Sequence, residues 1–214
     1  MISTTYMSFK KINFFSPFYL KKNLKDDFKL IRDEILNDII YNYNLKNNNC
    51  TWWGVNTDEN KTTTDLEGLK KINYEKIIPI YEKNLNDYNK KNLSIDYKVK
   101  IDEIWYIAYD KGKEATIHQH ANGAHDKNFS CIHFFKFDPK LHNSVTFCNN
   151  RRVLNRYYTK KNAKYKNIDY LEEEYTPEVI QDDLIVFPSE TYHRVKKNES
   201  DELRITICFN VKLV

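Results

Sequence analysis

Residues 203–214 read LRITICFNVKLV, which is the clearest strand signal in the chain. One face of this strand would carry Leu203, Ile205, Ile207, Phe209, Val211 and Leu213, and the other Arg204, Thr206, Cys208, Asn210 and Lys212. Successive side chains of a strand point to opposite faces, so we expect the apolar face to pack against a core. The polar face then lines either solvent or a polar cavity.

Several shorter runs rich in aromatic and β-branched residues precede this strand. We predict strands at residues 101–109, 115–120, 130–137, 144–148 and 183–187. A charged, tyrosine-rich insertion at residues 149–178 interrupts the series. A succession of short strands of this kind favours a small antiparallel barrel.

The first half of the chain is expected to be helical. Asn23 would cap a helix whose apolar residues recur every three or four positions, at Leu24, Phe28, Ile31, Ile35 and Ile39. A second helical stretch begins near Asp65, and Pro79 either kinks it or starts a new helix. No linker separates the halves. We therefore predict one α+β domain over residues 1–214, with a mainly helical support region at 1–98 and a barrel core at 99–214.

Length and composition exclude several functional classes. A length of 214 residues suits one domain. A net charge of +4 is too small and too dispersed to indicate a nucleic-acid interface. The cysteines lack C-x-x-C spacing, and three lie in strand-like runs, as expected of reduced, buried thiols. The N-terminus has no signal-peptide core, and no stretch approaches the roughly 20 apolar residues that span a bilayer. We expect a soluble cytoplasmic protein with no membrane partner.

All the histidines lie in one stretch of the chain, between His118 and His193. Because His118 and His120 are two residues apart on a predicted strand, both imidazoles would point the same way, roughly 6–7 Å apart. His193, from a distant strand, would complete one face of an octahedron and leave the opposite face open for oxygen and a co-substrate. We expect a loop, a barrel-lining and a surface position, respectively, for His125, His133 and His142.

The sequence around these histidines contains a series of motifs. They are WYIAYDKG at 105–112, HQH at 118–120, SCIHFF at 130–135, DDLIVFPS at 182–189, HRV at 193–195 and RITICFN at 204–210. In order, spacing and flanking residues together they resemble the catalytic core of 2-oxoglutarate/Fe(II) oxygenases. The prolyl-hydroxylase-like branch and the oxygenases of marine phages are the nearest in pattern. The resemblance covers residues 100–214 and implies a double-stranded β-helix, a jelly-roll or cupin-like core supported by N-terminal helices.

The resemblance also implies the cofactors, Fe(II) and 2-oxoglutarate, and a catalytic set of His118, His193 and Arg204. Arg204 would bind the far carboxylate of 2-oxoglutarate, because a planar guanidinium matches a carboxylate and stays charged when buried. Tyr109 corresponds to a position that often hydrogen-bonds the same co-substrate. The residues expected to bind 2-oxoglutarate are Arg204, Tyr109, Thr206 and Asn210.

The chain departs from the family pattern at His120, where the family usually has Asp or Glu. His120 could ligate the metal, giving a three-histidine centre. It could also stand aside while water completes the coordination sphere, or Asp126 in the following loop could supply the carboxylate. We prefer the first alternative, with His118, His120 and His193 as the metal ligands.

The sequence thus predicts an Fe(II)- and 2-oxoglutarate-dependent oxygenase, a hydroxylase that uses oxygen and acts on an unassigned substrate. A peptidyl substrate is the family default, and the compartment would be the host cytoplasm if the chain is viral. One alternative is a non-catalytic jelly roll, either a binding module or a viral structural protein. Another is a three-histidine metal dioxygenase that does not use 2-oxoglutarate.

Overall fold

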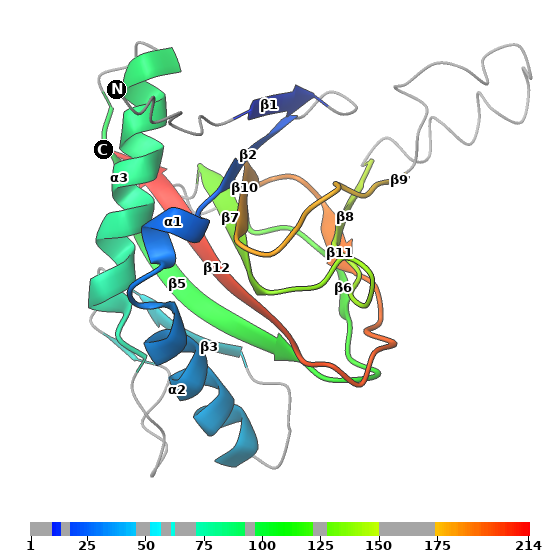
Figure 1. Ribbon diagram of the computed structural model, residues 1–214. Coiled ribbons are helices and arrows are strands. Elements are labelled where there is room, and N and C mark those ends of the chain that lie inside the picture. Colours follow the sequence, from blue (N-terminus) through cyan, green and yellow to red (C-terminus); the bar gives the residue numbers. More distant parts are fainter. Residues whose placement is uncertain are drawn as a thin grey trace, which may run out of the picture.

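In the part of the chain that it describes, the computed structural model has two antiparallel sheets and three helices (Figure 1). The structure describes residues 10–13, 18–45, 52–56, 61–62, 72–92, 97–121, 128–149 and 174–214. The expected helix start near Asp65, most of the insertion at 149–178 and the positions of His125 and Asp126 lie outside these residues.

The larger sheet has eight strands in the order β1-β2-β10-β7-β12-β5-β3-β4. Their bounds are β1 Lys10–Asn13, β2 Phe18–Asn23, β3 Trp52–Asn56, β4 Lys61–Thr62, β5 Val99–Tyr109, β7 Phe129–Lys136, β10 Asp183–Pro188 and β12 Arg204–Leu213. The long strand β12 lies at its centre, paired with β5 on one side and β7 on the other.

The smaller sheet has four strands in the order β6-β11-β8-β9. Their bounds are β6 Ala115–His118, β8 Val145–Cys148, β9 Glu174–Tyr175 and β11 His193–Val195. The strands predicted from the sequence are all present, within a few residues at their ends. The structure adds β9 and β11 to the barrel, and the N-terminal region supplies strands as well as helices, since β2 pairs with β10 and β3 with β5.

The helices are α1 Lys25–Phe28, α2 Arg32–Leu45 and α3 Tyr74–Asn92. The single helix predicted from Leu24 onward is therefore two helices, separated at residues 29–31. Asn23 belongs to β2, where it pairs with Asp183, although its Oδ1 still accepts a hydrogen bond from the Lys25 amide at 3.1 Å. Pro79 lies inside α3, near its N-terminal end. No helix in the described part of the chain has the length and apolar character needed to cross a membrane.

The two faces of β12 contact different cores. Its odd-numbered residues, Ile205 to Val211, join the apolar cluster formed with the helices, which cover one face of the larger sheet (Figure 1). Its even-numbered residues face the barrel interior, where Cys208 joins a second cluster with Trp105, Phe134 and Phe147. The polar face of β12 is almost completely buried. Of the two predicted environments for that face, solvent or the interior, the structure has the interior.

Two histidines occupy positions that differ from those predicted. His133 is fully buried on the helix side of the sheet, against Phe28 and Tyr81, and not in the barrel lining. His142, expected on the surface, is also buried. Its Nδ1 accepts a hydrogen bond from the Asp138 amide at 3.0 Å. The alternation of β7 identified buried positions, but both faces of that strand are buried and alternation cannot tell them apart.

A buried ionic cluster joins the helices to the larger sheet. Arg32 donates to Asp182 and to the carbonyl of Phe135, and Asp182 Oδ1 lies 3.6 Å from His133 Nε2. The Tyr81 hydroxyl lies 2.7 Å from His133 Nδ1. Asp182 has a φ of 68°, a left-handed conformation that aspartate tolerates better than most residues.

Candidate metal and co-substrate site

Three histidines meet at one end of the barrel. His118 ends β6 and pairs directly with His193, the first residue of β11. His120 lies just beyond β6, where its amide donates to the Ser189 carbonyl at 3.0 Å. One nitrogen from each histidine lies within 4.8 Å of the others. The predicted metal residues are therefore brought together by two segments that lie far apart in the sequence, the end of β6 with the residues after it and the start of β11.

Backbone carbonyls fix the tautomers of His118 and His193. His118 Nδ1 lies 2.7 Å from the Thr116 carbonyl oxygen, and His193 Nδ1 lies 2.9 Å from the Thr191 carbonyl oxygen. A carbonyl oxygen only accepts hydrogen bonds, so each Nδ1 must carry the proton. Nε2 of each ring then keeps its lone pair, which is the arrangement found in most histidine ligands of metals.

Burial keeps His193 neutral. Desolvation, with smaller contributions from the neighbouring His118 and His120, lowers the pKa of His193 to about 3, although the Thr191 carbonyl opposes the shift. The side chain is only 3% exposed. A neutral imidazole is the form that binds a metal ion, so the site needs no deprotonation of His193 at neutral pH.

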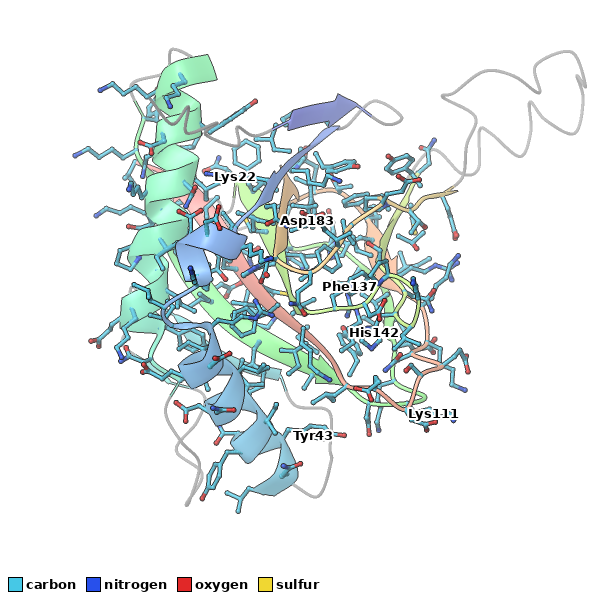
Figure 2. All side chains as sticks on the ribbon, viewed as in Figure 1. Lys22, Tyr43, Lys111, Phe137, His142 and Asp183 are labelled. Carbon is cyan, nitrogen blue, oxygen red and sulfur yellow. The ribbon has the colours of Figure 1, made fainter. Side chains whose placement is uncertain are left out.

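Arg204 is the first residue of β12 and lies on its interior face, six positions before Asn210, the residue of β12 that contacts His120. It is 1% exposed, and none of its three guanidinium nitrogens has a hydrogen-bond partner among the described residues. Its guanidinium carbon lies 5.0 Å from the ring centre of Tyr109, 5.7 Å from that of Phe134 and 5.9 Å from that of Phe137. Phe137 in turn packs against His142, with ring centres 5.6 Å apart (Figure 2).

The electrostatics of this guanidinium are unfavourable in the structure as it stands. Burial lowers the pKa of Arg204, and only Tyr109 and Cys208 oppose that shift. A buried cation without a charged partner costs free energy unless an anion joins it. An anionic ligand placed next to Arg204 would remove this cost by forming an ion pair with it.

The other residues expected to bind 2-oxoglutarate are distributed along the same wall. Tyr109 pairs with Arg204 across β5 and β12, and Thr206 is buried next along β12, with Cys208 Sγ 3.7 Å from its Oγ1. Asn210 lies at the histidine end, where its amide contacts His120. Tyr109 and Thr206 thus lie near Arg204, whereas Asn210 lies near the histidine cluster.

Sequence reasoning missed Glu103 and Ser130, which contact Asn210 from the neighbouring strands. A signal for Glu103 was present. It shares the interior face of β5 with Trp105, and a charged residue on the buried face of a strand indicates a polar partner.

The chain matches a family model described as "Putative 2OG-Fe(II) oxygenase" over residues 103–210, about half of its length. A search of curated protein sequences finds no match. Among solved structures it is similar to a prolyl-4-hydroxylase from Pseudomonas putida, with 12% identity, 91% of this chain and 87% of that chain covered, and a TM-score of 0.53.

Two further structures are similar over most of their length. AviO1 from Streptomyces viridochromogenes Tue57 has 10% identity, 91% of this chain and 89% of that chain covered, and a TM-score of 0.57. The non-heme alpha ketoglutarate dependent epimerase SnoN from nogalamycin biosynthesis has 10% identity, 90% and 76% covered, and a TM-score of 0.55. Two other matched chains, with TM-scores below 0.5, are spanned to 57% and 50% of their length. The three likenesses with TM-scores above 0.5 confirm the predicted fold, a double-stranded β-helix with helical support.

Proposed function

This chain belongs to the 2OG-Fe(II) oxygenase family, and from that premise we propose that it is a working Fe(II)- and 2-oxoglutarate-dependent hydroxylase. The observation that carries the proposal is Arg204, a buried guanidinium with no hydrogen-bond partner among the described residues. It lies on the wall of the same barrel whose end holds the three-histidine cluster. A jelly roll that binds no anion would have no use for an unpaired buried cation.

The residues present fit both cofactors. Three imidazoles suit Fe(II), and they occupy one side of the site, which leaves positions for oxygen and for the keto-acid end of the co-substrate. The planar fork of Arg204 matches the far carboxylate of 2-oxoglutarate. When bound, the metal supplies oxygen activation coupled to the conversion of 2-oxoglutarate to succinate and carbon dioxide.

The protein's own residues would act by positioning and by excluding water. The Thr116 and Thr191 carbonyls orient His118 and His193, so that Nε2 of each ring keeps the lone pair that a metal would accept. Rings of Tyr109 and Phe134 surround Arg204 and keep water from the ion pair, which strengthens it. The likeness to a prolyl-4-hydroxylase makes a peptidyl substrate the first class to test.

The test measures ligand binding before it measures turnover. Under anaerobic conditions, with Mn(II) in place of Fe(II), 2-oxoglutarate should raise the Tm of the wild type and bind in calorimetry. The Arg204→Met variant should bind the metal but not 2-oxoglutarate, and His193→Ala should lose the metal. Arg194→Met is the matched control, because Arg194 pairs with Glu174 at 2.8 Å and lies outside the proposed site. With Fe(II) and oxygen, the wild type and Arg194→Met should release succinate, and Arg204→Met and His193→Ala should not.

Two results would overturn the proposal, and they point to different alternatives. Metal binding by the wild type without any binding of 2-oxoglutarate would favour a three-histidine enzyme that does not use this co-substrate. Failure of the folded wild type to bind metal would favour a jelly roll without catalysis.

A further inference from the structure

The third histidine of the cluster, His120, is held differently from the other two. His118 and His193 each bond to the carbonyl two residues earlier in the chain, a contact that does not depend on side chains. His120 Nδ1 instead lies 2.9 Å from Asn210 Oδ1 and 3.1 Å from Ser130 Oγ. The orientation of His120 is therefore set by side chains from other strands.

These side chains form a line across three adjacent strands. Asn210 of β12 pairs in register with Glu103 of β5 on one side and with Ser130 of β7 on the other. Asn210 Nδ2 donates to Glu103 Oε1, and Ser130 Oγ donates to Asn210 Oδ1 at 2.7 Å. Ser189 Oγ lies 3.0 Å from Ser130 Oγ. Asn210 and Ser130 are both at most 1% exposed, so water does not compete for these bonds.

The chemistry of the partners fixes which end of the Asn210 amide faces His120. A carboxylate only accepts hydrogen bonds, so Glu103 must face the amide nitrogen. The amide oxygen is then directed at His120, and because that oxygen also only accepts, His120 Nδ1 must carry the proton. The lone pair of His120 lies on Nε2, as it does in the other two rings.

We propose that Glu103, Asn210 and Ser130 form a positioning relay that makes His120 the third metal ligand. The inference rests on the proposed function only in naming a metal as what the cluster binds. The family pattern has a carboxylate as a metal ligand. In this chain the carboxylate of Glu103 would instead lie outside the coordination sphere, connected to the His120 imidazole by two hydrogen bonds through Asn210. A partner of this kind fixes the tautomer and raises the basicity of the ligand it bonds. Asn210 would thus serve the metal and not the co-substrate.

The relay makes a prediction for the metal-free protein. Nitrogen-15 NMR of labelled histidine should show His120 as the Nδ1–H tautomer in the wild type. Asn210→Leu keeps a similar volume but removes the acceptor, so the Nε2–H tautomer should appear in that variant. This readout needs neither metal nor activity.

Metal binding gives the second readout, with Co(II) as the probe. Asn210→Leu should weaken Co(II) binding by about 10- to 100-fold, the usual effect of removing such a partner. The absorption spectrum of bound Co(II) should change as well, because one imidazole leaves the coordination sphere. Asn89→Leu is the matched control: Asn89 is a buried asparagine of α3 that donates to the Tyr97 carbonyl, away from the cluster. It should change stability and leave Co(II) affinity and spectrum as in the wild type.

A double exchange separates positioning from simple packing. In Glu103→Gln with Asn210→Asp, the glutamine can donate to the new carboxylate, which still accepts from His120 Nδ1. This pair should restore the tautomer and most of the Co(II) affinity. Glu103→Gln alone lets the Asn210 amide turn over, and it should weaken binding.

Three results would overturn the relay. They are an Nε2–H tautomer of His120 in the wild type, wild-type Co(II) affinity and spectrum in Asn210→Leu, and failure of the double exchange to restore what the single variant loses. Failure of the wild type to bind Co(II) at all would instead overturn the proposed function. The tautomer of His120 would then still decide whether the relay orients the imidazole.

Discussion

Replacing Arg204 by methionine should make the ligand-free protein more stable, although most substitutions of buried residues do the reverse. Methionine has a similar length, fills irregular space well and carries no charge. The guanidinium it replaces is buried without a hydrogen-bond partner among the described residues. The variant therefore removes the free-energy cost of burying an unpaired guanidinium.

The size of the effect follows from the surroundings of the guanidinium. At about 1–3 kcal/mol for each unsatisfied buried group, the three nitrogens cost roughly 3–9 kcal/mol. The rings of Tyr109, Phe134 and Phe137, all within 6 Å, return roughly 1.5–6 kcal/mol by cation–π attraction. We expect a net gain of about 2 kcal/mol in the free energy of unfolding, which is about 4–8 °C in Tm for a chain of this size.

Arg32→Met is the control, and it should lower the free energy of unfolding where Arg204→Met raises it. Arg32 also lies over an aromatic ring, with its guanidinium carbon 4.7 Å from the ring centre of Phe135, but it is bonded to Asp182. Removing it leaves that buried carboxylate without its cation and should cost about 3–5 kcal/mol. The same substitution thus stabilises or destabilises according to whether the arginine has a partner.

Urea denaturation with and without 2-oxoglutarate is the assay. At about 100 times its dissociation constant, the co-substrate should add about 2.7 kcal/mol to the metal-loaded wild type and nothing to Arg204→Met. A ligand-free variant less stable than the wild type would refute the account of Arg204 as an unpaired cation. Equal stabilisation of both proteins by 2-oxoglutarate would refute its role in binding.

Three further predictions concern the buried cluster beneath the helices. Asp182→Asn keeps a residue that tolerates the φ of 68°, so Asp182→Ala should be less stable than Asp182→Asn by about 1–2 kcal/mol in urea. Burial lowers the pKa of His133 in the folded state, so below a pH of about 6.5 the unfolded chain takes up the proton first. The folded protein should therefore lose stability as the pH is lowered below about 6.5, by up to about 1.4 kcal/mol per pH unit. His133→Gln should reduce that slope, and an unchanged slope would contradict this assignment. Tyr81→Phe removes the hydroxyl 2.7 Å from His133 Nδ1 and should cost about 1–2 kcal/mol, with an unchanged urea m-value.

The sequence was most informative where a strand has two chemically different faces. The alternation in β12 predicted which residues face the barrel interior, and Arg204, Thr206, Cys208 and Asn210 are all buried there. The spacing of His118 and His120 predicted a shared direction. The structure brings them together although β6 ends at His118, because the bond from the His120 amide to Ser189 holds the chain beyond the strand.

Long-range pairing and the choice between two buried faces could not be read from the sequence. Nothing local in residues 18–23 shows that they pair with β10, more than 150 residues later. The pairing also takes Asn23 into a strand and shortens the predicted helix. His133 was misplaced for a related reason. Periodicity reports burial, but β7 has a helix layer on one side and the barrel interior on the other.

His120 and Arg204 both affect the net charge of the barrel interior, because a histidine stands where the family has a carboxylate and the arginine has no anionic partner among the described residues. A metal dication held by three neutral imidazoles keeps its full charge of two, and Arg204 adds a third positive unit on the same wall. The usual carboxylate ligand would cancel one of these units directly. Here the carboxylate of Glu103 reaches the cluster through Asn210, so a larger share of the compensation would come from the co-substrate. A dianion that chelates the metal at one end and reaches Arg204 at the other meets that need. A monoanionic keto acid of the same chelating type leaves Arg204 unpaired, and it should bind the metal-loaded protein far more weakly than 2-oxoglutarate.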